Sequence, residues 1–331
     1  MECIPLGSEE SAKKGPPENV SSESLEDFIR TLPTREGWSQ PMVLYKNYWC
    51  RPHLIGKIMQ LQDSFKPRYK DIILATQPKC GTTWLKALAF TITNRSRYSF
   101  TDHPLLTSNP QYLVPFIEIP DNGRDHTYLE TLPSPRLLST HMPLSMLPPE
   151  TSSHGCRLVY LCREPKDALV SRWHFENRIV EGSNIELVKA FDMFCEGFSP
   201  SGPFWNHCLE YWKESLARPN EVLFLKYEEI KSHPEQVVRQ LAKFLGVPLT
   251  EEEESSSVAE KMVKLCSFEN LTSLKVNQTG GVDHGNKIYV ENSVFFRKGK
   301  VGDWANHMSE EMAEKLDHVV EQMLKGSGLA F

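Results

Sequence analysis

The chain has no long uninterrupted hydrophobic stretch. In 331 residues, no apolar run approaches the roughly 20 residues of a membrane-spanning helix. Residues 1–24 are rich in serine, glutamate, lysine and proline, with no apolar segment like that of a secretory signal. We therefore expect no membrane partner and a cytoplasmic location. We interpret residues 1–24 as a flexible N-terminal tail and residues 25–331 as one folded domain.

The sequence also has no surplus of basic residues. Its 37 lysines and arginines are outnumbered by 43 aspartates and glutamates, and the formal net charge is −6. A nucleic-acid partner is not expected, because such binding requires a basic surface. Any anion that the protein binds must instead be held by local groups.

Paired cysteine motifs are missing as well. The 8 cysteines are scattered, without a CxxC pair and without the spacing of a zinc site. Several lie within apolar runs, which is typical of reduced, buried cysteines. The pattern favours a reducing compartment and gives no sign of a bound metal.

What the chain does have is a regular alternation of short apolar runs and amphipathic segments. Strands are predicted at 72–75, 136–140, 157–162 and 221–226, and most are followed by a segment with helical spacing. Such alternation predicts an α/β fold, a single domain with a central parallel sheet flanked by helices.

Polar residues follow all four predicted strands. Lys79 follows the first strand and His141 the second, while Arg163 follows the third and Tyr227 the fourth. Functional groups of parallel sheets lie at the carboxyl ends of the strands. Core packing does not explain a basic or polar residue at four strand ends, so we predict one functional site there.

The stretch 71–90 has the features of a P-loop-like anion-binding loop. A short apolar strand leads into a turn with Lys79 and Gly81, and a predicted helix begins beside Thr82 and Thr83. Unpaired amides and the positive end of the helix dipole attract an anion at such a place. The alternative is an ordinary strand–helix connection with a buried lysine stem, although lysine, glycine and two threonines rarely crowd a core turn.

A second anion site is predicted around Arg163. A helix begins just after it and carries Ser171 two turns on, which suits a clamp for a second phosphate. The alternative is a surface ion pair with Glu164 or Asp167. Residues 295–304 form a compact basic segment, which is either a solvated turn or a further phosphate contact.

His141 is the candidate general base. A lone histidine is more often structural, but a neutral imidazole at a strand end can take a proton from a hydroxyl, an effect of about 10²–10⁴ in rate.

Two anion sites and a histidine suggest a nucleotide donor with more than one phosphate group. A kinase is disfavoured because the chain lacks GxxxxGK[ST] and an obvious acidic residue for Mg²⁺.

Four motifs in order carry a family resemblance. They are PKCGTTWLKAL, THMP at 140–143, YLCREPKDALVSRWHF at 160–175 and FFRKGKVGDW at 295–304. Together they resemble the cytosolic sulfotransferase family, and the plant branch in particular. The likeness extends from about residue 25 to the C-terminus.

The resemblance implies transfer of a sulfuryl group from 3'-phosphoadenosine 5'-phosphosulfate (PAPS) to an acceptor hydroxyl, without a metal. It implies that His141 is the base and that Lys79 stabilises the leaving oxygen. It assigns the phosphosulfate-binding loop and the other donor contacts to Lys79, Cys80, Gly81, Thr82, Thr83, Trp84, Arg163, Ser171, Tyr227, Cys266, Ser267, Phe268, Arg297, Lys298 and Gly299.

Two departures from the family pattern bear on these expectations. Cys80 stands where a serine is usual, so one hydroxyl donor to the phosphate is expected to be lost. The segment 305–314 keeps only the final glutamate of the dimerisation segment of animal relatives, which favours a monomer.

The acceptor is expected to be a small molecule. Plant relatives act on flavonols, brassinosteroids, hydroxyjasmonate or desulfo-glucosinolates. Candidate pocket residues favour a flat or bulky hydrophobic alcohol or phenol; they are Trp49, Phe116, Met142, Phe204 and Trp205. A small-molecule kinase and a non-catalytic nucleotide-binding protein remain as alternatives of other classes.

Overall fold

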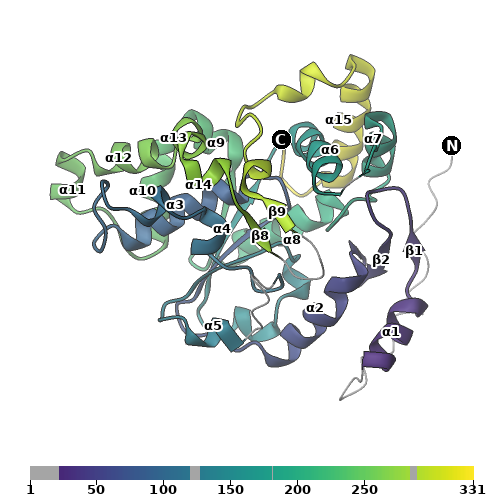
Figure 1. Ribbon diagram of the computed structural model, residues 1–331, viewed down its shortest axis with the longest axis horizontal. Coiled ribbons are helices and arrows are strands. Elements are labelled where there is room, and N and C mark those ends of the chain that lie inside the picture. Colours follow the sequence, from purple (N-terminus) through teal and green to yellow (C-terminus); the bar gives the residue numbers. More distant parts are fainter. Residues whose placement is uncertain (1–21, 120–126, 181, 284–288) are drawn as a thin grey trace.

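The centre of the molecule is a parallel sheet of four strands. This computed structural model describes residues 22–331 apart from 120–126, 181 and 284–288 (Figure 1). The strand order is β5-β4-β6-β7, and all three pairings are parallel. The strands are β4 (Ile72–Thr76), β5 (Leu137–Thr140), β6 (Arg157–Cys162) and β7 (Val222–Lys226). Each lies within one residue of its predicted range, so the predicted parallel sheet is confirmed.

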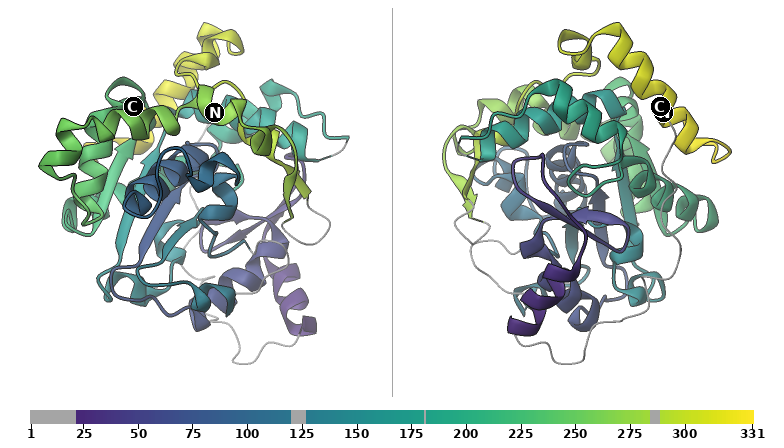
Figure 2. Two further views of the ribbon diagram at one scale, coloured as in Figure 1. Left: turned by 60° about the vertical axis from the view of Figure 1, so that its left-hand side comes forward. Right: turned by 90° about the vertical axis from the view of Figure 1, so that its right-hand side faces the viewer.

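Helices cover both faces of this sheet. The longer ones are α2 (Pro52–Ser64), α3 (Thr82–Asn94), α6 (Pro165–Ile179), α7 (Leu187–Cys195), α8 (Phe204–Ala217), α10 (Pro234–Phe244), α12 (Val258–Leu265) and α15 (Glu310–Leu324). Figure 1 shows α3, α10 and α12 on one side of the sheet, with α6, α7 and α15 on the other. Figure 2 shows α15, in yellow, on the outside of the molecule, beside the teal helices.

The alternating side chains of the strands build two cores. Ile72 and Leu74 pack into the core below α3 and α10, whereas Ile73 and Ala75 belong to the core shared with α2, α6 and α8. Successive residues of a strand point to opposite faces, so a strand covered on both faces must be apolar throughout. This requirement explains why the strands read as continuous apolar runs.

Several short elements complete the described part of the chain. Two small antiparallel units were not predicted: the sheet β1 (Thr34–Arg35), β2 (Met42–Tyr45) and β3 (Tyr48–Cys50), and the hairpin β8 (Gly281–Asp283) and β9 (Tyr289–Glu291). The short helices are α4 (Pro110–Leu113), α5 (Thr127–Thr131), α9 (Tyr227–Ser232), α11 (Glu251–Ser255), α13 (Phe268–Ser273) and α14 (Lys275–Gln278). Elements of two to six residues are too short for a clear hydrophobic period.

At the N-terminus, helix α1 (Ser22–Thr31) begins three residues before the predicted start of order at residue 25. The rest of the predicted tail, residues 1–21, lies outside the described residues. Within the described ranges, no helix is both long and apolar enough to cross a membrane.

A buried ion pair holds the starts of β4 and β5 together. Arg136 and Asp71 immediately precede these two strands, and both side chains are fully buried. Nη2 of Arg136 lies 2.6 Å from Oδ2 of Asp71, and the guanidinium also donates to the carbonyl of Lys66 at 2.7 Å. The backbone amide of Arg136 donates to Oδ1 of the same carboxylate. The pair therefore links side chain and backbone at the amino edge of the sheet.

We predict that Arg136→Met lowers the free energy of unfolding by about 3–5 kcal/mol, because it leaves the carboxylate of Asp71 buried without its counter-ion. Denaturant titration measures the loss. The control is Lys66→Met, which removes an exposed charge close by and should change stability by less than about 0.5 kcal/mol. Equal effects of the two variants would contradict the assignment.

Candidate active site

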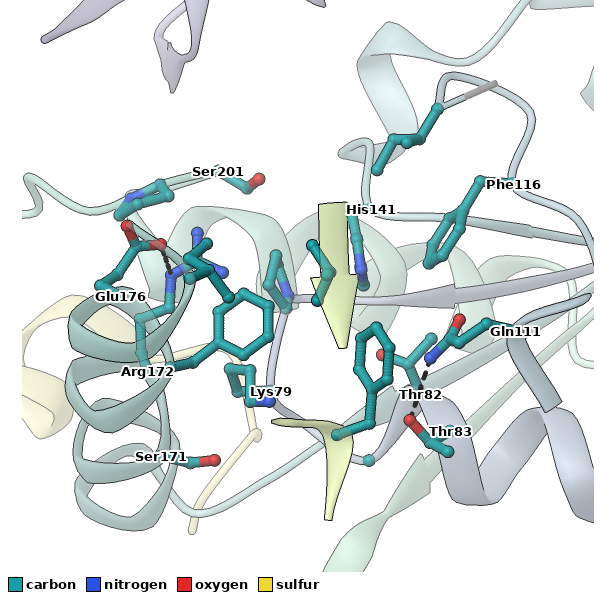
Figure 3. A pocket seen from close by; sticks show the side chains of 18 of the residues that line it. Lys79, Thr82, Thr83, Gln111, Phe116, His141, Ser171, Arg172, Glu176 and Ser201 are labelled. Atoms are coloured by element: carbon teal, nitrogen blue, oxygen red, sulfur yellow. Dashed lines mark hydrogen bonds and ion pairs between the residues drawn. The ribbon is translucent and has the colours of Figure 1, made fainter. Parts of the chain in front are cut away.

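One large cavity opens at the carboxyl edge of the parallel sheet. It encloses about 540 Å³, and Figure 3 shows side chains entering it from α6, from the β4–α3 loop and from the end of β5. Fourteen of the predicted site residues line it: Lys79, Gly81, Thr82, Thr83, Trp84, His141, Arg163, Ser171, Tyr227, Cys266, Phe268, Arg297, Lys298 and Gly299. Residues up to 220 positions apart in the chain thus meet in one place.

The β4–α3 loop is shaped by two residues in the left-handed region. Lys79 has φ 75° and Gly81 has φ 107°. A Cβ atom on Gly81 would lie 2.8 Å from the ring of Tyr227 and 3.0 Å from Leu161, so only glycine fits there. Gly81 directly precedes α3, whose first amides face the cavity wall at Thr82 and Thr83. The loop therefore presents a helix N-terminus to the cavity, as an anion-binding loop does.

Lys79 lies among other cations. Its Nζ is 4.0 Å from the centroid of the Phe175 ring. Burial, reinforced by the charges of Arg172 and Arg163, lowers the pKa of Lys79 to about 7. A bound anion would neutralise this repulsion and restore the charge of the ammonium group.

His141 is held in one tautomer by the end of β4. Its Nδ1 lies 2.8 Å from the carbonyl oxygen of Thr76 and 3.2 Å from the hydroxyl of the same residue. A carbonyl only accepts, so Nδ1 carries the proton and Nε2 is left with a free lone pair. Burial lowers the pKa of His141 to about 3 against the opposing effect of this hydrogen bond. The imidazole is therefore neutral in the free protein, and Nε2 is the ring nitrogen that can accept a hydrogen bond.

Glu118 is a site residue that the sequence analysis missed. Its Oε1 accepts a 2.6 Å hydrogen bond from the backbone amide of His141, and the side chain lines the cavity. Oε2 has no hydrogen-bond partner among the described residues. Burial raises the pKa of Glu118 to about 7. No local pattern singles out this glutamate, because its place beside His141 arises from a contact between distant segments.

A hydrogen-bonded pair supports the start of α3 from the side. Nε2 of Gln111 donates to the hydroxyl of Thr83 at 3.0 Å, while Oε1 of Gln111 accepts from Nζ of the buried Lys86 at 2.6 Å. Figure 3 shows the Gln111–Thr83 contact. This arrangement fixes the orientation of a hydroxyl that faces the cavity.

The ion pair that the sequence left open as an alternative for Arg163 does form, but it is buried rather than at the surface. The pair joins Arg163 to Asp167 at 3.2 Å, and the arginine lines the cavity, with its guanidinium carbon 4.7 Å from the centroid of the Tyr227 ring. Asp167 also accepts from the amides of Gly302 and Trp304, at 2.8 Å and 3.0 Å. The carboxylate thus joins the predicted basic segment to the start of α6.

The basic segment itself is ordered by an acid. Asp303 forms ion pairs with Arg297 and with Lys298, the latter at 2.8 Å. Burial alone would raise the pKa of Asp303, but hydrogen bonds from these two cations hold it below its usual range. The segment is therefore held by ion pairs as a wall of the cavity, while Lys298 and Lys300 remain exposed to solvent.

Two predicted donor contacts lie outside the cavity lining. The thiol of Cys80 is fully buried in the core under the loop, and its amide donates to the carbonyl of Gln77. Ser267 caps α13 by accepting from the amide of Asn270 at 3.1 Å. The side chain at position 80 points into the core and does not face the cavity. The expectation that Cys80 costs the site a hydroxyl donor is therefore wrong.

The predicted aromatic pocket is also only partly correct. Phe116 and Met142 line the cavity, whereas Phe204 and Trp205 are buried in the core below it. Trp49 packs edge-on against Phe198 with ring centroids 4.8 Å apart. The sequence could not distinguish the two groups because all five positions are apolar.

Comparison with known proteins gives consistent matches. The sulfotransferase domain model matches residues 69–328. Cytosolic sulfotransferase 15 of Arabidopsis thaliana is 42% identical, and the alignment covers 100% of this chain and 93% of that protein. Cytosolic sulfotransferase 1 of the same plant is 43% identical over 94% of this chain and 95% of its own length.

Solved structures share the fold. A crystal structure of an Arabidopsis thaliana sulphotransferase superposes with a TM-score of 0.71 at 36% identity, covering 96% of this chain and all of that one. A mouse sulfotransferase complexed with PAP has a TM-score of 0.67 at 24% identity, covering 86% of this chain and 95% of that one. These matches extend over the sheet and the helices on both of its faces.

We predict that sulfate, which stays fully ionised, binds more weakly as the pH rises from about 6 to about 9. The pKa of Lys79 is about 7 in the free protein, so above that pH the amine must take up a proton before it pairs with the anion, and affinity falls by up to about tenfold per pH unit. Calorimetry at several pH values measures the affinity of the protein for sulfate. Lys79→Arg should keep its affinity at high pH, and an affinity of the natural protein that does not change with pH would contradict the assignment.

Proposed function

This chain belongs to the sulfotransferase family, and we propose that it transfers the sulfuryl group of PAPS to a hydroxyl of a small molecule, with His141 as general base. The observation that carries the proposal is that a neutral His141 with a free Nε2 lines the same cavity as Lys79, Arg163 and the basic residues Arg297 and Lys298. The Arabidopsis relatives are named cytosolic, and we propose the cytoplasm for this protein as well.

The reaction then follows from the geometry. Nε2 of His141 takes the proton of the acceptor hydroxyl while the oxygen attacks sulfur. The bond between sulfur and the bridging oxygen breaks, and 3'-phosphoadenosine 5'-phosphate (PAP) leaves with the electron pair. Lys79 neutralises the charge that develops on the bridging oxygen. Preorganised cations and amides lower such a barrier because they need no reorganisation during the reaction.

The donor would lie between the β4–α3 loop and the basic segment. We assign the 5'-phosphosulfate to the loop at Lys79–Thr83 and the 3'-phosphate to Arg163, Ser171 and the residues Arg297–Gly299. The rings of Trp84 and Tyr227, with centroids 5.4 Å apart, would border the adenine. Cys266 and Phe268 line the same end of the cavity.

The other classes of function fit less well. Membership of the sulfotransferase family favours sulfuryl over phosphoryl transfer, which disfavours a small-molecule kinase. A non-catalytic nucleotide-binding protein would have no use for an imidazole whose tautomer is fixed toward the cavity. We propose as acceptor a small hydrophobic metabolite of the kinds used by plant relatives, including flavonols, brassinosteroids, hydroxyjasmonate and desulfo-glucosinolates.

We predict that His141→Ala lowers the rate of sulfation at least about 10²-fold, because the proton of the acceptor is no longer removed. Purified protein is assayed with labelled PAPS and a panel of phenols and alcohols, and PAP affinity is measured by calorimetry in parallel and should change little. The matched control is the exposed His154→Ala. Near-normal turnover of the His141 variant would refute its role as the base.

A further inference from the structure

The cavity contains charged groups that the proposed sulfuryl transfer does not use. Arg172 and Glu176 project into it from α6, and Arg51 reaches it from the residue that precedes α2. Figure 3 shows Arg172 and Glu176 on α6 beyond Ser171, on the side toward Ser201. This acid and these two bases, called the Arg172 cluster below, lie in the part of the cavity left for the acceptor.

The Arg172 cluster has one more cation than anion. Glu176 is fully buried between the two arginines, 2.7 Å from Nη2 of Arg51 and 3.1 Å from Nε of Arg172. Burial alone would raise the pKa of Glu176, but Arg172 and Arg51 hold it below its usual value. Burial lowers the pKa of Arg172 to about 10, so this arginine stays charged at neutral pH. A net positive charge therefore remains in a largely apolar cavity.

Arg172 is the incompletely paired member of the cluster. Arg51 also has neutral acceptors, Gln40 and Ser39. Arg172, whose side chain is only 11% exposed, has Glu176 as its single ionic contact, and no hydrogen bond from its guanidinium reaches any residue in the described part of the chain. A buried charge without hydrogen bonds is costly, which points to an anion that arrives with a ligand.

The donor does not require this arginine. Its phosphates and sulfate are matched in the proposed function by Lys79, by Arg163 and by the basic segment. Arg172 still lies near the reaction centre, because its charge contributes to the low pKa values of both Lys79 and His141. The same cavity is also lined by apolar side chains, among them Ile58, Met146 and Ile179.

We propose that the acceptor carries a carboxylate in addition to its hydroxyl, and that Arg172, supported by Arg51 through Glu176, binds this carboxylate. The planar guanidinium can donate two parallel hydrogen bonds to a carboxylate, which is the strongest geometry for such a pair. The body of the acceptor lies on the apolar lining, and its hydroxyl reaches Nε2 of His141. This inference rests on the proposed sulfuryl transfer and narrows its acceptor, among the alcohols and phenols considered above, to those that also carry a carboxylate.

The competing interpretation is that Arg172 stabilises the sulfuryl group in the transition state of its transfer. That role would serve every acceptor equally, so removal of the arginine would slow acids and neutral compounds alike. A carboxylate site instead changes the discrimination between an acid and its uncharged ester. The ratio of the two rates separates the interpretations.

The experiment compares hydroxy acids with their methyl esters as acceptors for PAPS. The distance between the carboxylate and the hydroxyl of the acceptor is unknown, so two series of different lengths are used. One is phenolic (4-hydroxybenzoate, 4-hydroxyphenylacetate and 3-(4-hydroxyphenyl)propanoate), and the other consists of aliphatic ω-hydroxy acids. We expect kcat/KM for the best acid to exceed that of its ester by about 10- to 100-fold. Arg172→Gln should bring this ratio close to one.

Arg178→Gln is the matched control. Arg178 lies on the same helix and carries the same charge, but its side chain is exposed and outside the cavity lining. This variant should keep the ratio of the natural protein. Arg51→Gln is the second test variant, used if Arg172→Gln does not fold, and it should also lower the ratio.

Binding provides a readout that does not depend on turnover. With PAP at saturation, an acid should raise the melting temperature of the natural protein more than its ester does, and Arg172→Gln should remove the difference. If esters are sulfated as well as acids and bind as well, the carboxylate site is refuted while sulfuryl transfer stands. If acids bind preferentially but no acceptor is sulfated, the proposed function fails and the site stands.

Discussion

The parallel pairing of β4 with β5 is the constraint on which the site depends. At the amino edge, the buried Asp71–Arg136 pair links the two strands. At the carboxyl edge, the carbonyl of Thr76 fixes the imidazole of His141. Because side chains alternate along a strand, a slip of one residue would turn His141 to the other face of the sheet and remove it from the cavity. The same register therefore determines both the stability of the sheet and the tautomer of His141.

The charges around the cavity form the second level of organisation. The chain is acidic overall, with a net charge of −6, yet its cations converge on one concave surface. Buried carboxylates hold many of them in place: Asp167 beside Arg163, Asp303 beside Arg297, and Glu176 beside Arg172. The acids order the cations without fully neutralising them, so the cavity keeps an excess of positive charge around a neutral imidazole.

The sequence predicted the strand-end residues well because their chemistry is local. Lys79, His141 and Tyr227 lie at or just beyond the ends of predicted strands, and parallel strands bring such positions to one edge. Glu118 and Arg172 escaped the analysis, since one follows an irregular segment and the other reads as an ordinary helical arginine. Cys80 was taken for a lost phosphate contact, although the loop turns its thiol into the core. The direction of a side chain within a tight turn depends on neighbours from other elements.

By itself, the sequence determined the sheet, the glycine-bearing turn after its first strand, and the family, because strand patterning, glycine placement and the four ordered motifs are properties of contiguous residues. The tertiary structure decided which aromatic residues face the cavity and which nitrogen of His141 is free. It also decided that Lys79 has a depressed pKa and that Arg172 lacks a full set of partners. These properties come from burial and from charges contributed by distant segments, whose free-energy effects exist only once the chain is packed.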